Sequence, residues 1–158
     1  MPTSYFSAGI LLALVFIPSA TMADPLHPFL GSWGGTGRVI VDDGKSEQIK
    51  CNGYYRPTDG QTGLGVSIRC ASASYSIQLR SALTINGSQI SGSWEERTFN
   101  VQGQLSGRMD GERMVLTIDG GALKAAMTIA VSGSSQSVVL TTQGSGLREV
   151  RMALARAH

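Results

Sequence analysis

Apolar and polar residues alternate along most of this chain, in stretches that end at short glycine-containing turns. These turn sequences are Asp43-Gly44, Asp59-Gly60, Asn86-Gly87, Asp110-Gly111, Gly120-Gly121, Ser132-Gly133 and Gly144-Ser145-Gly146. Because successive side chains of a strand point to opposite sides, alternation of this kind is typical of half-buried strands. Short glycine-containing loops favour tight hairpins between antiparallel neighbours. The pattern predicts an all-β, up-and-down antiparallel meander of about ten strands.

The hairpins place the apolar residues of successive strands on one shared face. A two-residue loop at Asp110-Gly111, for example, places Leu105 opposite Leu116. A slip by one residue would turn every such side chain to the other face. A meander with one apolar face has to cover that face, and closure into a barrel also removes exposed strand edges. We therefore expect a single barrel domain over residues 33–158.

Two interpretations remain open for the tail from Leu147 to Ala157. The alternation of Val150, Met152 and Leu154 favours a last strand that closes the barrel. The arginine, alanine and leucine residues of the same segment are good helix formers, and they favour a helix instead.

Residues 1–23 predict a secretory signal peptide. The apolar run from Ile10 to Ile17 is too short to cross a bilayer, and small residues follow it up to a cleavage site after Ala23. A buried N-terminal helix is the alternative interpretation. Cleavage would leave a lead-in segment, residues 24–32, before the barrel, and would place the protein in the periplasm or outside the cell. No later stretch is apolar enough to be a membrane segment.

The chain has two cysteines, Cys51 and Cys70. A hairpin centred near Gly60-Gln61 places them directly opposite each other, at a separation that a disulfide accepts. Export would bring them to an oxidising compartment, where disulfides persist. Because the sequence has no CxxC motif and no histidine beside them, we expect a structural bridge. Closing a loop of about twenty residues should stabilise the fold by roughly 3 kcal/mol.

Charge and chemistry exclude several classes of function. The net charge of +2 comes from scattered residues, which argues against nucleic acid or an anionic membrane as a partner. The two histidines, His27 and His158, lie before the first strand and at the last position, so neither a catalytic triad nor a zinc site is supported. Glu96 is the one carboxylate with interior parity, and a place at the barrel rim beside Arg97 explains it. We expect no enzyme, no metal and no cofactor.

The barrel interior is the candidate site. The large side chains expected to point inward, and to contact a ligand, are Trp33, Tyr55, Trp94, Phe99, Met114 and Met127. Inward glycines lie among them, at Gly35, Gly37, Gly53, Gly92 and Gly103. Glycines leave space and methionines adapt to irregular apolar shapes, so the interior is suited to a small hydrophobic ligand.

The same residues allow a second interpretation. Inward glycines also serve bends in strands, and the aromatic side chains would then form an ordinary filled core. In that case the protein is an envelope structural or protein-interaction module, whose outer face, with Tyr54, Arg69 and Arg80, meets a partner that the sequence does not identify.

Gly31-Ser32-Trp33, just before the first expected strand, resembles the Gly-x-Trp opening of the calycin superfamily, the lipocalins and their relatives. The resemblance implies a small barrel that binds a small apolar molecule. It also implies that Trp33 closes one end of the barrel and that an arginine of the last strand packs across its ring. Arg148 begins that strand and shares the parity of Val150, so Arg148 is the matching candidate. Haem-binding relatives use a histidine close to the C-terminus, whereas here the histidine is the last residue.

Overall fold

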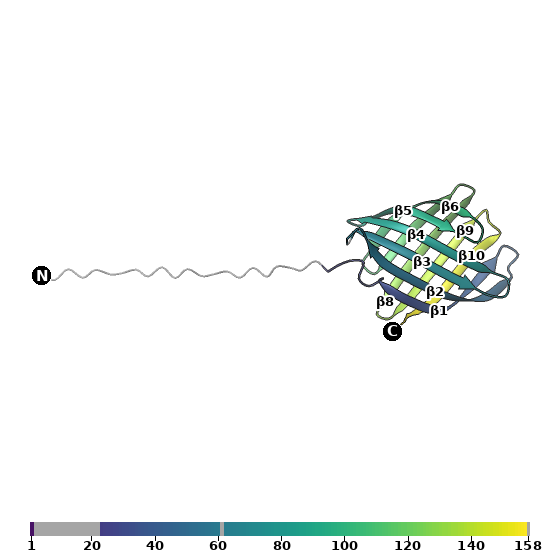
Figure 1. The fold of residues 1–158 in the computed structure, drawn as a ribbon, viewed down its shortest axis with the longest axis horizontal. Coiled ribbons are helices and arrows are strands. Elements are labelled where there is room, and N and C mark those ends of the chain that lie inside the picture. Colours follow the sequence, from purple (N-terminus) through teal and green to yellow (C-terminus); the bar gives the residue numbers. More distant parts are fainter. Residues whose placement is uncertain (2–22, 61, 158) are drawn as a thin grey trace.

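The computed structural model describes residues 1, 23–60 and 62–157, in which ten strands form a closed antiparallel barrel (Figure 1). The strands are β1 (Gly31–Val41), β2 (Ser46–Thr58), β3 (Gly63–Ala71), β4 (Ser76–Asn86), β5 (Gln89–Glu96), β6 (Val101–Asp110), β7 (Arg113–Gly120), β8 (Leu123–Ser132), β9 (Ser135–Gln143) and β10 (Leu147–Arg156). Each strand pairs with its neighbours in sequence, and β1 pairs with β10. The predicted all-β barrel is confirmed, and the ambiguous tail is the closing strand.

The predicted signal peptide falls almost entirely on residues 2–22, which lie outside the described residues. Within the described ranges, no helix is long and apolar enough to cross a membrane.

Strict alternation along the strands produces one apolar core inside the barrel. In β7, Met114, Leu116 and Ile118 are buried, and the residues between them are exposed. β2 and β10 show the same alternation along most of their length. The buried apolar residues form a single cluster to which all ten strands contribute. The shared apolar face of the sequence is therefore the inner wall of the barrel.

The hairpin between β6 and β7 pairs two residues away from the predicted register. Leu105 pairs with Ile118, and Leu116 pairs with Gly107. Gly111 has a φ of 57° and is the first residue of the loop, so the turn is of the type that has glycine in that position. Because the shift is even, the same side chains still point inward.

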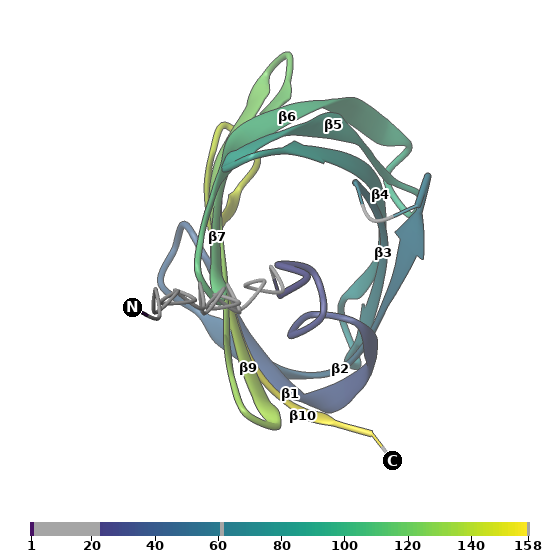
Figure 2. The ribbon, with the colours of Figure 1, turned by 90° about the vertical axis from the view of Figure 1, so that its left-hand side faces the viewer.

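One end of the barrel is closed by the lead-in segment. We call this the closed end: β1 begins there and β10 ends there. Residues 24–30 turn back into the barrel at this end, beside β1 (Figure 2). Leu26 and Phe29 in this turn are both 0% exposed. The turn is held by an Asp24 carboxylate oxygen, which accepts from the Leu26 amide at 2.9 Å, and by the Leu26 carbonyl, which accepts from the Phe29 amide at 2.9 Å.

Candidate functional site

Trp33 fastens the lead-in segment to the barrel wall. Its side chain is buried, and its indole N–H donates to the Phe29 carbonyl at 2.8 Å. The Arg156 guanidinium lies over the Trp33 ring, 4.2 Å from its centroid. Arg156 also donates to the carbonyl of Pro28 at 2.8 Å and to the carbonyl of Leu30. One arginine thus holds both the tryptophan ring and the backbone that leads to it.

The arginine on Trp33 is Arg156, and the prediction of Arg148 is wrong. In the antiparallel pairing of β1 with β10, Trp33 at the start of β1 pairs with Arg156 at the end of β10. Arg148 is the second residue of β10, so it lies at the opposite end of the barrel, where it is exposed. Both arginines share the inward parity of Val150. The antiparallel direction of the closing strand distinguishes them, because it brings the end of β10 to the start of β1.

Five of the six side chains expected inside the barrel are buried there, and the sixth is not. Trp33, Tyr55, Trp94, Met114 and Met127 are all buried. Phe99 is 65% exposed, so its predicted interior position is wrong. β5 ends at Glu96, and the four residues that follow form a turn before β6, in which Asn100 takes a φ of 55°. Strand parity does not continue through such a turn.

The five buried side chains do not converge on a single point. Tyr55 and Trp33 lie at the closed end, where Gly31 of β1 pairs with Tyr55 of β2. Trp94 lies toward the other end, where its indole N–H donates to the Asp119 carbonyl at 3.4 Å near the end of β7. The interior therefore has two separate aromatic regions.

The inward glycines do not create the space that we expected. A Cβ added to Gly35, Gly92 or Gly103 would lie within 2.1 Å of a carbonyl oxygen of the neighbouring strand. At Gly37 the corresponding distance is 2.5 Å, and the position beside Gly53 is filled by the Tyr55 ring. These glycines allow neighbouring backbones to approach closely where the wall bends. The expectation that they leave room for a ligand is wrong.

The end opposite the lead-in has a different lining. We call it the open end: β1 ends there and β10 begins there. Half-buried apolar side chains gather at this end, in the first or last residues of the strands or in the β3–β4 turn. They are Val41, Tyr75, Ile77, Leu79, Val101, Leu123, Leu140 and Leu147, and we call them the apolar ring. At the closed end the inward apolar side chains of the strands are buried, each 7% exposed or less, so accessible apolar surface on the inner wall is concentrated in this ring.

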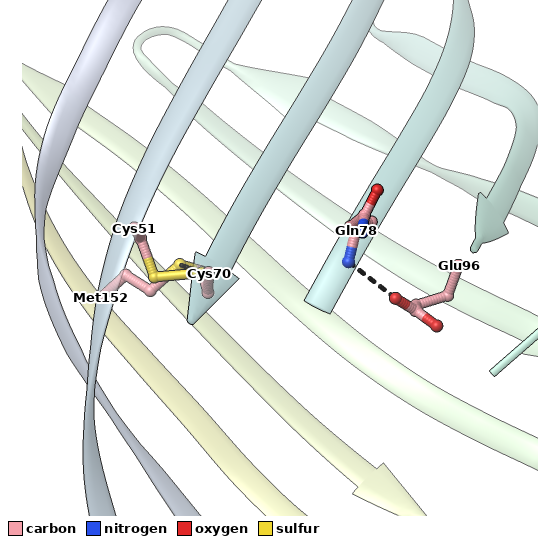
Figure 3. The surroundings of a disulfide bond; sticks show 5 residues. All are labelled: Cys51, Cys70, Gln78, Glu96 and Met152. Atoms are coloured by element: carbon pink, nitrogen blue, oxygen red, sulfur yellow. Dashed lines mark hydrogen bonds between the residues drawn. A yellow bond between two sulfur atoms is a disulfide. The ribbon is translucent and has the colours of Figure 1, made fainter. Parts of the chain in front are cut away.

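The Glu96 carboxylate also lies at the open end, where it holds backbone in place. One oxygen accepts from the Gln78 amide at 2.7 Å, as Figure 3 shows, and the other accepts from the Phe99 amide at 2.7 Å. Arg97 forms its ion pair with Glu95 at 4.0 Å, not with Glu96. Glu96 therefore joins the start of β4 to the turn after β5, in a structural role beside the apolar ring.

The disulfide between Cys51 and Cys70 is confirmed (Figure 3). The two residues pair directly between β2 and β3, and both sulfurs are buried on the inner wall. The sulfur of Met152 lies 3.6 Å from that of Cys70. The bridge therefore belongs to the core of the barrel and not to an accessible redox site.

One buried polar pair was not predicted from the sequence. Gln136 of β9 is 2% exposed, and its side-chain carbonyl accepts from the Tyr55 hydroxyl at 3.0 Å. Burial raises the pKa of Tyr55 well above its ordinary value, so the phenol stays protonated. The inward parity that Gln136 shares with Val138 could have identified it. Among the described residues, no group of three or more histidine, cysteine, aspartate or glutamate side chains could hold a metal ion.

Comparison with known proteins adds evidence on the fold. No family model matches the chain, and no curated protein matches it. The crystal structure of Rv2717c from M. tuberculosis matches with a TM-score of 0.67 at 14% identity, over 87% of this chain and 100% of that chain. The S-type phycobiliprotein lyase CPES from Guillardia theta matches with a TM-score of 0.59 at 12% identity, over 84% of this chain and 90% of that chain. Together with the closed barrel, these matches confirm the calycin-like fold.

The second of these structures contradicts our prediction that the chain is not an enzyme. That prediction rested on finding no catalytic arrangement in the sequence, yet a protein with a similar barrel is a lyase. At 12% identity the likeness shows the fold alone, so the reaction of the lyase is not transferred to this chain.

Proposed function

We propose that this calycin-like barrel binds a small hydrophobic molecule, which enters at the open end and packs against the apolar ring. The observation that carries the proposal is the difference between the two ends. Leu26 and Phe29 are fully buried in the closed end, whereas the apolar ring leaves half-buried side chains at the other. Removing such surface from water is favourable, at about 25 cal/mol per Å². The proposal concerns binding alone.

The composition of the inner wall supports a ligand of variable shape. Met127 and Met152 lie on the inner wall, and Met114 lies deeper. Methionine side chains rotate about three bonds and can repack around an apolar guest. The guest would therefore make its own room between the ring and the core.

We also propose that the protein acts in the periplasm or outside the cell. The Cys51–Cys70 disulfide supports this location, because such bridges persist in oxidising compartments. The apolar run and small residues of positions 1–23 support it as well.

Two valine substitutions test the binding site. Val101 belongs to the apolar ring, whereas Val115 lies on the outer wall and is 37% exposed. In a titration with a fluorescent fatty-acid probe, Val101→Glu should weaken binding at least about tenfold, because the bound ligand would remove the new carboxylate from water at a large cost in free energy. Val115→Glu should bind like the wild type. No saturable uptake of the probe, or equal losses in both variants, would contradict the proposal. Native mass spectrometry of protein from its own envelope should show a bound molecule.

A second candidate function is a protein-interaction module with a filled interior. The close approach of the inward glycines to neighbouring backbone favours it, because they open no cavity. On the outer wall, a groove of about 550 Å³ runs over β4, β5 and β6, with Arg80, Glu95 and Gln102 in its lining. Cross-linking in periplasmic extract should then recover a partner in stoichiometric amount, and Arg80→Glu should abolish its recovery.

A further inference from the structure

Among the described residues, Gln136 is the one polar or charged residue that is buried, and its side chain pairs with Tyr55. Gln136 pairs with Leu154 of β10 and with Val131 of β8, so it lies on the inner wall at the closed end. Tyr55 reaches it from β2. The Gln136 side-chain nitrogen is buried and has no hydrogen-bond partner among the described residues.

This pair leaves two donor hydrogens unpaired in either orientation of the amide. With the Tyr55 hydroxyl donating to the Gln136 carbonyl, both N–H bonds of the amide are free. If the amide were turned over, one N–H would donate to the phenol, and the second N–H and the phenolic O–H would be free. Buried donors without acceptors are costly, and an apolar side chain at position 136 would leave one such donor, the Tyr55 hydroxyl, in place of two.

We infer that the free donors of Gln136 bind an acceptor oxygen at one end of the hydrophobic ligand. This inference rests on the proposed function and names the chemical class of its ligand: an apolar chain that ends in an uncharged carbonyl group, as in a ketone, an ester or an amide.

The polar pair itself argues for an uncharged oxygen. The amide is neutral, and the phenol is protonated, so neither supplies a positive charge to a carboxylate. The guanidinium of Arg156, at the same end, is already directed to the carbonyls of Pro28 and Leu30 and to the Trp33 ring. A carboxylate buried beside neutral donors alone would be far more costly than a carbonyl.

The geometry of β9 sets the length of the ligand. Gln136, Val138 and Leu140 are successive inward residues, and Leu140 belongs to the apolar ring. Four residues of strand span about 13 Å. A ligand whose oxygen meets Gln136 therefore needs an apolar chain of about this length to reach the open end, with Val138 along its path.

Three ten-carbon compounds test the inference: 2-decanone, decane and decanoate, each competing with a fluorescent fatty-acid probe at pH 8. The wild type should bind 2-decanone about tenfold more tightly than decane, and more tightly than decanoate. Gln136→Met, of similar volume, should remove the preference for the ketone and retain the affinity for decane. Gln143→Met is the matched control, because Gln143 is an exposed glutamine at the other end of the same strand, and its preference should be unchanged.

The outcomes separate this inference from the proposed function. If decane and 2-decanone bind equally, or if Gln136→Met leaves their ratio unchanged because a water molecule meets the donors, the carbonyl ligand is refuted and the hydrophobic site stands. Tighter binding of decanoate would refute the uncharged end group. If none of the three compounds displaces the probe, both proposals fail. Urea unfolding of Gln136→Met should show a midpoint close to that of the wild type, since the variant removes two unpaired N–H donors but leaves the Tyr55 hydroxyl without its acceptor.

Discussion

Replacing Arg156 by alanine should destabilise the barrel strongly, whereas the same replacement at Arg148 should have little effect. The first substitution removes a guanidinium that lies 4.2 Å from the centroid of the Trp33 ring. It also removes donors to the carbonyls of Pro28 and Leu30. The lead-in segment would then be held by its own turn, by the Trp33 hydrogen bond to the Phe29 carbonyl and by the apolar contacts of its buried side chains.

The expected loss follows from the contacts that disappear. A cation over an aromatic ring contributes about 0.5–2 kcal/mol. Hydrogen bonds from a charged donor contribute about 1.5 kcal/mol each, and less where water can replace them, as at this half-buried residue. We therefore expect Arg156→Ala to lower the free energy of unfolding by about 2–4 kcal/mol. Arg156→Lys keeps the charge and loses the planar fork, so its loss should be intermediate.

Urea denaturation of the oxidised protein measures these losses. With a slope of about 2 kcal/mol per molar urea, a loss of 3 kcal/mol moves the midpoint down by about 1.5 M. Arg148→Ala changes an exposed side chain and should stay within about 0.5 kcal/mol of the wild type. If the two alanine variants unfold at the same urea concentration, Arg156 does not hold the closed end.

Three further predictions concern the rest of the barrel. Replacing Cys51 and Cys70 by alanine should cost about 3 kcal/mol in urea unfolding, because the bridge closes a loop of about twenty residues; an unchanged midpoint would contradict a structural role. Burial raises the pKa of Tyr55, so the folded state keeps a proton that the unfolded chain releases above about pH 10. The free energy of unfolding should therefore fall as pH rises above that value, and fall less steeply in Tyr55→Phe; equal slopes would argue against the buried phenol. Gly103→Ala should cost about 1–3 kcal/mol because the added Cβ would lie 1.9 Å from a backbone oxygen, whereas Gly34→Ala, with no backbone within 3.4 Å, should be close to neutral in thermal unfolding.

The barrel could be predicted from the sequence because its evidence is local. Every strand carries its own alternation, and an even error in register leaves the faces unchanged. The hairpin at Gly111 shows an error in register that leaves the inward face unchanged. Its turn places the glycine first in the loop, so Leu105 moves from its expected partner to Ile118, and both residues still point inward.

The candidate site was less predictable because it depends on which strand ends lie together. Parity alone does not distinguish Arg148 from Arg156, whereas antiparallel closure of β1 on β10 does. Parity also fails at Phe99, which lies in a turn. The role of the inward glycines is set by the distance to the next backbone, which no single strand reveals. Gln136 had the correct parity for the interior, and only its contact with Tyr55 draws attention to it.

The pairing of the first strand with the last has a consequence for how the molecule is made. The bond from Arg156 to the Leu30 carbonyl joins residues 126 positions apart in the chain. Contacts of such high sequence separation form slowly, because the loop between them must first be ordered. Hairpins can assemble one after another as the polypeptide is synthesised, but β1 cannot pair with β10 until this final strand is available. Until then, the edges of β1 and of the growing sheet are open to other chains, which makes a prematurely terminated copy prone to aggregation.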